Sequence, residues 1–195
     1  MCGRYTLFSK KKIYSKFNVK IEKNYNISPR QNVWIIDENF STLSHKWGFV
    51  KEWYRKKFFI FNARSETIKT KNVFKNLKRC IFLADGYYEW VKSDKKKLPY
   101  YHYLKNELVF FAGLYNDQGC CIVTTQSSNY LSFIHHRQPL YFTEEFIELW
   151  LKSKEEKIIC NKLLHYIPVS EDVNKIWNNS PELISGSFSN ISKEI

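Results

Sequence analysis

The residue with the most unusual chemical position in the chain is Cys2, in the opening stretch MCGRYTLF. Aminopeptidases generally remove an initiator methionine when the second residue is small, and the loss of Met1 would place an α-amine and a thiol on one residue. An α-amine with a pKa near 7.7–8.0 is partly neutral at physiological pH, so such a terminus carries two nucleophiles. If Met1 stays, Cys2 is a small apolar side chain of the interior. These first residues alone leave both alternatives open.

Two further stretches carry side chains suited to proton transfer or anion binding. In NARSE (62–66), alternation along an extended chain would place Asn62, Arg64 and Glu66 on one face; a solvated strand end is the alternative. In ADGYYEW (84–90), Glu89 lies between two aromatic residues, and such surroundings could raise its pKa enough for acid–base catalysis. A glutamate paired with an arginine is the competing interpretation.

Two adjacent histidines precede an arginine in IHHRQPLYF (134–142). Histidine suits proton transfer near neutral pH, although single histidines are more often core or surface residues than catalysts. Neighbouring side chains of an extended chain point in opposite directions. We therefore expect at most one of His135 and His136 to face a shared site.

The charge of the chain is strongly asymmetric. The net charge is +12, and residues 1–105 hold 24 Lys and Arg against 8 Asp and Glu, whereas residues 106–195 hold 7 against 11. A basic half favours a polyanionic partner, most simply nucleic acid. Aromatic residues are interleaved with basic ones in KEWYRKKFFIF (51–61), and unpaired bases stack on exposed rings. A lysine-rich solvated surface and an anionic membrane are the alternatives.

Length and composition are those of a globular protein that folds without a covalent or metal crosslink. The 195 residues fit one domain, and the 44% hydrophobic content predicts a core without disulfides or metal. No segment is apolar enough to cross a membrane, and no signal peptide is evident, so we expect an intracellular protein that is not secreted. The five cysteines contain no C-x-x-C pair, which argues against a disulfide framework and a zinc site.

Short runs rich in β-branched and aromatic residues predict an α+β fold dominated by antiparallel strands. We expect these strands to form an open, barrel-like sheet with a few flanking helices. The predicted strands lie in residues 32–37, 57–63, 80–90, 100–105, 108–115 and 120–125, and hairpin loops are expected at 93–99 and 115–119.

Three segments have helical patterns. Residues 9–17 form the first, and residues 154–168 form the last, ending before Pro168. In residues 143–153, Thr143 can cap the helix, and Phe146, Leu149 and Trp150 fall on one face.

Taken together, these stretches resemble the SRAP family, the SOS-response-associated peptidases or abasic-site processing proteins. The resemblance runs from residue 1 to about 183, in the family's order. It rests on MCGRY, YNISPRQ (25–31), WGF (47–49), NARSET (62–67), LADGYYEW (83–90), FAGLY (111–115), IHHRQP (134–139) and VSEDVN (169–174). It implies a single domain over 1–183, with 184–195 as a disordered tail.

The resemblance implies a sensor of abasic sites in single-stranded DNA. The amine of Cys2 would form a Schiff base with the ring-opened abasic-site aldehyde, and the thiol would then close a thiazolidine, a covalent DNA–protein crosslink that shields the lesion. The family's other catalytic positions fall on Asn62, Glu89 and His135, with His135 assisting ring opening and a lyase-type side reaction. Autoproteolysis would be limited to the protein's own N-terminus. No cofactor and no metal are implied.

The DNA-binding positions implied by the resemblance are Arg4, Arg64 and Arg137, which would hold phosphates, and Trp47, which would stack on a base or wedge beside the abasic gap. Single-stranded DNA and single-strand/double-strand junctions should bind better than intact duplex. A monomer is expected.

The chain departs from the family pattern at three places. His136 stands where an acidic residue is common, Gln138 replaces a common methionine, and WGFVKEW lacks a proline often found there. These departures affect DNA positioning more than the reaction.

Two alternative functions remain from the residues. N-terminal-nucleophile glutamine amidohydrolases also use a terminal cysteine, but their glutamine-binding motifs are not evident here. A non-covalent single-stranded DNA-binding module would need only the basic, aromatic surface.

Overall fold

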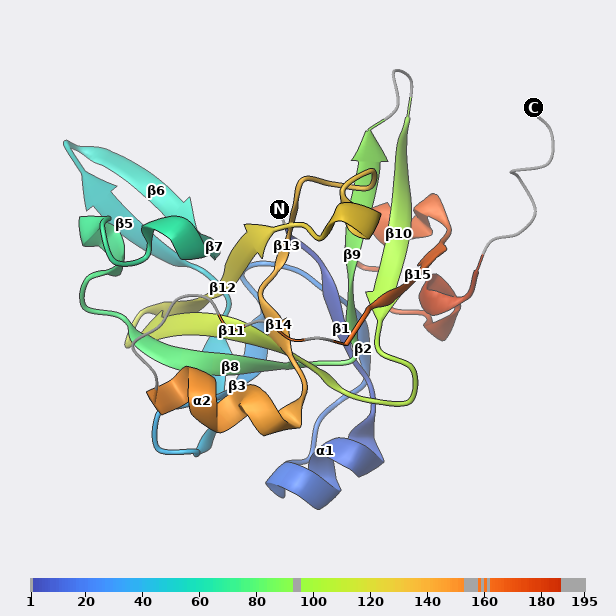
Figure 1. The fold of residues 1–195 in the computed structure, drawn as a ribbon, viewed down its shortest axis with the longest axis horizontal. Helices are drawn as coiled ribbons and strands as arrows, with labels where there is room; N and C mark the ends of the chain where they lie inside the picture. The colour runs from blue at the N-terminus through green and yellow to red at the C-terminus, as the bar shows by residue number, and fades with distance from the viewer. Residues whose placement is uncertain (1, 93–95, 153–157, 159, 161, 187–195) are drawn as a thin grey trace.

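The computed structural model describes the chain except for residues 1, 93–95, 153–157, 159, 161 and 187–195. Antiparallel strands dominate it, and they form two open sheets and a separate ribbon (Figure 1). The α+β prediction is therefore confirmed. The sheets remain open and do not close into a barrel.

The first sheet carries the beginning of the chain at its centre. Its strands are β1 (Tyr5–Leu7), β2 (Asn24–Ile27), β9 (Gly86–Lys92), β10 (Lys97–Tyr103) and β15 (His165–Pro168). They lie in the order β15-β10-β9-β1-β2, and all neighbours are antiparallel. Because β1 is paired on both sides, the residues just before it are held close to β9.

The second sheet has the order β13-β12-β11-β8-β3-β4. These strands are β3 (Asn32–Ile36), β4 (Thr42–Lys46), β8 (Lys78–Ala84), β11 (Val109–Asn116), β12 (Gly119–Gln126) and β13 (Arg137–Pro139). Two short strands join it: β14 (Tyr141–Phe142) pairs with β11, and β7 (Asn62–Arg64) pairs with β12 in parallel. The ribbon consists of β5 (Phe49–Trp53) and β6 (Lys56–Ile60).

All six predicted strand segments contain strands, but residues 57–63 divide into β6 of the ribbon and β7 of the second sheet. Residues 80–90 divide into β8 and β9, because the chain leaves one sheet and enters the other at Asp85–Gly86. The predicted hairpin at 115–119 is confirmed: the Asn116 side chain accepts hydrogen bonds from the backbone N–H of Gln118 and of Gly119. In the other hairpin, residues 93–95 lie outside the described residues.

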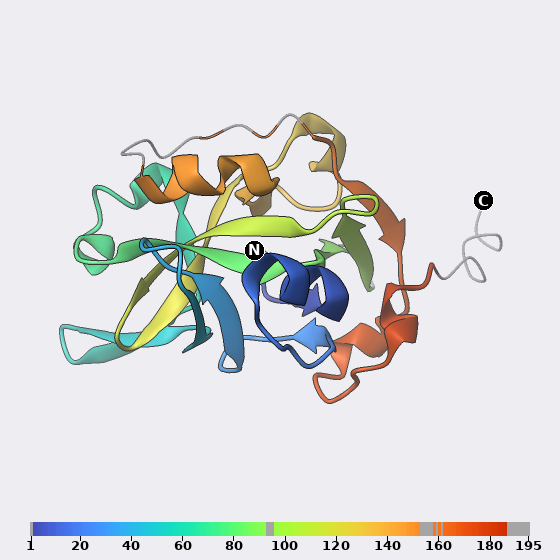
Figure 2. The same cartoon turned by 90° about the horizontal axis from the view of Figure 1, so that it is seen from below.

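The helices are α1 (Lys10–Phe17) and α2 (Ile147–Lys152), with a 3₁₀ turn at Glu144–Phe146 leading into α2. Further 3₁₀ turns occupy Ser65–Thr67, Asn72–Phe74, Asn129–Leu131, Glu171–Asn174 and Pro181–Ile184. Figure 2 shows the C-terminal turns beside β2, against which Pro181–Ile184 packs. The predicted tail begins inside this last turn, and its residues 187–195 lie outside the described residues.

Three details of the helix predictions are wrong. Thr143 stands at the N-cap position of the Glu144–Phe146 turn, but its side chain forms no capping hydrogen bond. Leu149 is half-exposed, and the buried residues of α2 are Ile147, Trp150 and Leu151. In the predicted helix at 154–168, residues 165–168 form β15, because their backbone groups pair with Tyr100–Tyr103 of β10. Residues 153–157, 159 and 161 lie outside the described residues.

Aromatic rings fill the space around β1. Tyr5 is fully buried and makes edge-on contacts with Trp47, Phe82 and Phe111, with ring centroids 5.2, 6.4 and 5.9 Å away. Such pairs contribute about 0.5–1.5 kcal/mol beyond the burial of their area. Cys2 belongs to the same core, so the first residues of the chain are fixed by packing from both sheets.

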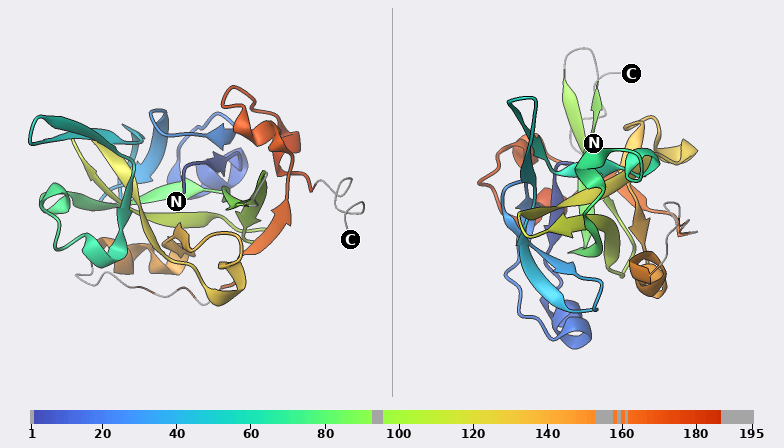
Figure 3. Two further views of the ribbon diagram at one scale, coloured as in Figure 1. Left: turned by 90° about the horizontal axis from the view of Figure 1, so that it is seen from above. Right: turned by 90° about the vertical axis from the view of Figure 1, so that its left-hand side faces the viewer.

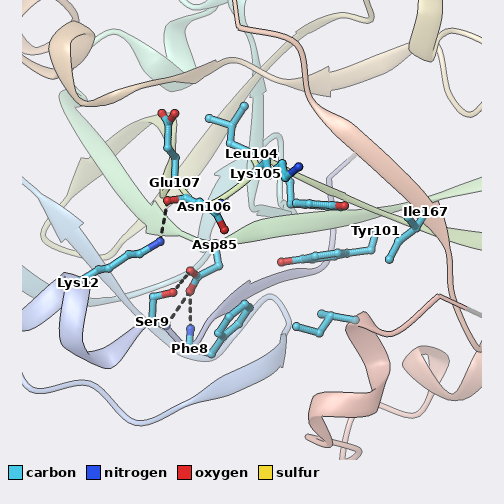
Figure 4. Close-up of a pocket in the computed structure, with 12 residues that line it drawn as sticks. Phe8, Ser9, Lys12, Asp85, Tyr101, Leu104, Lys105, Asn106, Glu107 and Ile167 are labelled. Atoms are coloured by element: carbon cyan, nitrogen blue, oxygen red, sulfur yellow. Dashed lines mark hydrogen bonds between the residues drawn. The ribbon is translucent and has the colours of Figure 1, made fainter.

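The turn at Asp85–Gly86 ties β1 and α1 to the sheets (Figure 4). The Asp85 carboxylate accepts hydrogen bonds from the backbone N–H of Phe8 at 2.6 Å and of Ser9 at 3.0 Å, and from the Ser9 hydroxyl. Gly86 is required by close approach, since a Cβ there would lie 2.3 Å from the carbonyl oxygen of His102. A pocket of 310 Å³ lies beside Asp85, and its polar groups already bond one another.

The stability of the fold should fall in mild acid because of His102. Its ring is buried and stacks on Tyr87 at 4.4 Å, and burial lowers its pKa from 6.5 to about 4. A lowered pKa contributes stability above pH 6.5 that is lost as pH falls toward 4, so protonation should remove about 2 kcal/mol by pH 4.5. Urea unfolding at pH 7 and pH 4.5 measures this. His102→Phe, which cannot titrate, should lose correspondingly less, and an equal loss in both proteins would contradict the assignment.

No helix among the described residues is both long and apolar enough to span a bilayer.

Candidate active site

Asn62 stands at the start of β7, where the chain leaves the β5–β6 ribbon and joins the second sheet. β7 lies parallel to β12, with Ala63 opposite Val123, and the Thr124 hydroxyl donates to the Ala63 carbonyl at 3.2 Å. The predicted alternation is confirmed: Ala63 and Ser65 are buried, whereas Arg64 and Glu66 are exposed. This pairing fixes the direction of the Asn62 side chain.

Asn62 contacts Cys2 directly. Its side-chain N–H donates to the Cys2 carbonyl oxygen at 2.7 Å. Its Oδ1 is buried and accepts no hydrogen bond from the described residues. The amide nitrogen of Asn62 therefore holds the backbone of Cys2, and the amide oxygen is available to accept a hydrogen bond inside the site.

The Cys2 thiol is fully buried. Burial raises its pKa well above the usual range, and the negative charge of Glu89 raises it further; the Arg4 backbone N–H, which bonds the sulfur, acts in the opposite direction. At neutral pH the sulfur is thus a protonated thiol and needs a base in order to react.

Glu89 lies on β9 with 5% of its surface exposed. Removal from water raises its pKa above 4.5. The Tyr88 backbone N–H donates to the Arg4 carbonyl at 2.9 Å, so Glu89 lies across from the residues that follow Cys2, and its charge raises the pKa of the Cys2 thiol. A buried carboxyl with a raised pKa can hold a proton nearer to neutral pH and pass it on.

His135 is held by the segment on both sides of it. The Ser127 hydroxyl donates to the His135 carbonyl at 2.6 Å, and the Arg137 backbone N–H donates to the ring Nδ1 at 2.9 Å. Burial lowers the pKa of His135 to about 4, so the ring is neutral at pH 7. Nδ1 also lies 3.2 Å from the Arg137 carbonyl oxygen, but the shorter contact with the Arg137 N–H favours the tautomer that carries its proton on Nε2.

His135 and His136 do not point to opposite sides. Their rings stack with centroids 4.4 Å apart, because the backbone bends at His136 before it enters β13. The charge of His136 is among those that act against burial and lower the pKa of the Glu89 carboxyl. The structure thus joins Asn62 to Cys2 directly and places Glu89 on β9, the strand that pairs with β1.

Arg137, for which a phosphate contact is predicted, is built into the fold. Its guanidinium is 8% exposed and forms a two-pronged ion pair with Glu66 at 2.7 and 3.0 Å. It also donates to the Thr124 carbonyl at 2.7 Å. The sequence alone leaves open that Glu89 pairs with an arginine. In the structure, the glutamate that pairs with Arg137 is Glu66.

Arg4 is also occupied by the protein. It donates at 2.8 Å to Asn26 and, at the same distance, to the carbonyl of Val173, which anchors the turn at Glu171–Asn174. Arg64 differs, because its side chain is exposed and forms no hydrogen bond or ion pair within the described part of the chain. Of the three arginines, Arg64 is the best placed to meet a phosphate.

Trp47, for which a base-stacking role is predicted, does not present its ring to solvent. It is fully buried, and its indole N–H donates to the Phe61 carbonyl at 2.9 Å. Its ring packs on Tyr5, Phe61 and Phe82. Trp47 thus holds the backbone of Phe61, the residue before β7, and so positions Asn62 indirectly.

A groove of 660 Å³ adjoins the site and shares Asn62 with it. Apolar rings line it, Phe58 is half-exposed, and the Arg30 guanidinium lies over the Phe59 ring at 4.2 Å. Its lining consists of Lys51, Phe58, Phe59, Ile60, Phe61, Asn62, Thr70, Lys71, Asn72, Val73 and Phe74. Figure 3 (left) looks onto the end of the molecule where the β5–β6 ribbon and the gold segment before β13 reach the surface.

The sequence carried a signal for part of this groove, because basic and aromatic residues alternate in residues 51–61. The opposite wall, residues 70–74, carried none. Among the described residues, no group of three His, Cys, Asp or Glu side chains is arranged to hold a metal ion.

Comparison with known proteins gives one consistent family. The model of the family described as SOS response associated peptidase (SRAP) matches residues 1–176. The abasic site processing protein YoqW of Bacillus subtilis is 34% identical, over 94% of this chain and 99% of that protein. The abasic site processing protein YedK of Escherichia coli is 29% identical over the same shares.

More distant proteins share the fold. The abasic site processing protein HMCES of Gallus gallus is 28% identical over 77% of this chain and 59% of its own length. A solved structure of a Bacteroides thetaiotaomicron protein superimposes with a TM-score of 0.81 at 24% identity, covering 95% of this chain and all of that one. At that identity the likeness establishes the architecture alone.

Proposed function

This chain belongs to the SOS response associated peptidase (SRAP) family, and we propose that it senses abasic sites in single-stranded DNA by bonding to them through Cys2. The observation that carries the proposal is the contact of Asn62 with Cys2 beside a buried Glu89. These groups surround the one residue that can supply both an amine and a thiol once Met1 is removed. That the lesion is an abasic site is inferred from the relatives, which are named abasic site processing proteins.

The reaction begins when the ring-opened deoxyribose presents its C1′ aldehyde. The neutral amine of Cys2 attacks C1′, and the resulting carbinolamine loses one water to give an imine. The S–H of Cys2 then adds across the C=N bond: sulfur bonds to C1′, and the proton passes to nitrogen. The product is a thiazolidine, and the only leaving group in the sequence is one molecule of water.

The neighbouring side chains divide the proton transfers. Glu89, with its raised pKa, gives a proton to the departing hydroxyl and takes one from the thiol. Asn62 holds the Cys2 backbone and accepts a hydrogen bond from the new amine through Oδ1. His135, protonated on Nε2, donates to the sugar ring oxygen as the ring opens, and it supports a slower lyase-type strand cleavage.

The groove beside Asn62 would hold the strand. Its rings offer stacking surfaces to unpaired bases, and Lys51 and Lys71 offer charge to phosphates, with Arg64 at the lesion itself. A strand bent toward Cys2 must be unpaired at the lesion, so single strands and single-strand/double-strand junctions should be preferred to duplex. We propose that a monomer acts within the compartment that holds the cell's DNA and that any peptidase action is limited to its own N-terminus.

The test is a denaturing gel of the protein mixed with an oligonucleotide carrying one abasic site, with intact mass recorded beforehand to establish the loss of Met1. A heat-stable shifted band should form with the abasic single strand and should be absent with an intact strand. If the mature protein lacks Met1 and gives no band, the covalent proposal fails. Glutamine hydrolysis and non-covalent strand binding would then be assayed in its place.

A further inference from the structure

Three aromatic side chains form a surface cluster at the edge of the first sheet, which we call the aromatic shelf: Tyr100, Phe133 and Tyr166. Phe133 meets Tyr100 edge-on, with ring centroids 6.2 Å apart and planes at 85°, and lies 5.6 Å from Tyr166. Tyr100 and Tyr166 are 6.1 Å apart. The three rings come from β10, from the turn after Asn129–Leu131, and from β15.

The shelf is continuous with the candidate active site. Tyr100 stands directly opposite Glu89 in the antiparallel pairing of β9 and β10, so the two side chains leave the same face of the sheet. Phe133 precedes His135 by two residues, and the hydrogen bond from Ser127 to His135 fixes that segment. A group bound at Glu89 and His135 therefore has the shelf as its neighbour.

The shelf is open to solvent. Phe133 is 55% exposed and Tyr166 is 39% exposed, which is unusual for large rings that pack on one another. Exposed rings offer stacking surfaces to an unpaired base.

We propose that the aromatic shelf stacks the nucleobase next to the abasic nucleotide, on one side of the lesion. The proposal rests on the proposed function and extends it. A base beside an abasic site has lost a stacking partner, so one of its faces is uncovered. The shelf supplies an aromatic replacement and thereby holds the gap over Cys2. The sequence pattern gave no sign of it, because its rings come from three separate segments.

The test is a double-mutant cycle between a ring and a base, read as the Kd of the full chain for single-stranded oligonucleotides by fluorescence anisotropy. The oligonucleotides carry tetrahydrofuran, an abasic analogue without an aldehyde, so no crosslink forms. In two further oligonucleotides, tetrahydrofuran also replaces the base on the 5′ or on the 3′ side. Phe133→Leu removes the exposed ring.

Phe133→Leu should weaken binding of the single-lesion oligonucleotide by about 10-fold, the usual effect of losing one base–aromatic stack. Removal of the neighbouring base on one side should weaken wild-type binding equally, and the two changes together should add nothing further. Phe40→Leu, at a 46% exposed ring elsewhere, should change nothing. Additive losses, or no loss from removing either neighbouring base, would overturn the proposal.

Tyr166→Leu provides a second route if Phe133→Leu does not fold. Because the wild-type comparison of the oligonucleotides needs no variant, an unchanged Kd without either neighbouring base decides against the shelf by itself. Failure of the proposed function gives a different result, namely no adduct with a true abasic site. If only the proposal for the aromatic shelf is wrong, the adduct with a true abasic site still forms.

Discussion

Cys2→Ser is expected to leave no heat-stable adduct with abasic single-stranded DNA, a loss of at least about 100-fold on a denaturing gel. The serine variant keeps the amine, so the imine can still form. A hydroxyl closes the five-membered ring far less readily than sulfur, and the imine hydrolyses on heating. Serine also fits the fully buried site with little change in volume.

Two controls separate the thiol's chemistry from damage to the fold. Cys160→Ser, at a partly exposed cysteine outside the site, should give the wild-type amount of adduct. Adding borohydride to the Cys2→Ser reaction should recover a band, because reduction traps the imine. A wild-type yield of heat-stable adduct from Cys2→Ser would assign the bond to another residue.

Glu89→Gln should slow adduct formation by about 10²- to 10⁴-fold, the range for loss of a general acid or base, with little effect on strand binding. In the wild-type protein the rate should fall as pH rises through the raised pKa of Glu89, because the departing hydroxyl needs its proton. The glutamine variant should lack that inflection. Single-turnover rates between pH 4 and 9 measure both effects.

The same variant should be slightly more stable than the wild type at neutral pH. Burial raises the pKa of Glu89 in the folded state, so its contribution to stability is fully present below the unfolded pKa and is lost as pH rises through the folded pKa. Glutamine removes that loss. Glu171→Gln, at an exposed position, is the matched control for rate and stability. A variant that is both slower and less stable, with an unchanged pH profile, would indicate a structural role.

Local patterns predicted the parts of the fold that are determined locally. The alternation in residues 62–66 and the Asn116 turn depend on neighbours a few residues away, and both were predicted correctly. β15 could not be predicted in this way, because its backbone groups bond to β10, some 65 residues earlier in the chain. Its own residues are compatible with a helix until that partner is present.

The site shows the same division between local and distant information. Motifs identified Cys2, Asn62 and Glu89, which the structure brings together. They could not tell that Arg137 is bound by Glu66, 71 residues away, or that Trp47 is enclosed by rings from several strands. For charged and aromatic residues, a motif indicates the residue type, whereas the partner determines whether the side chain is available.

The burial of Cys2 has a consequence for how long a bond to it would last. The residue is completely enclosed and continues directly into β1, which is paired with β2 and β9. Water or a nuclease would reach a linkage there less readily than one on an exposed residue, and most readily when this part of the protein opens. Its lifetime would then be governed by the free energy of local opening as well as by its chemistry, and release would accelerate with conditions that loosen β1. The stability of β1 would therefore help to set how long the linkage between the protein and DNA persists.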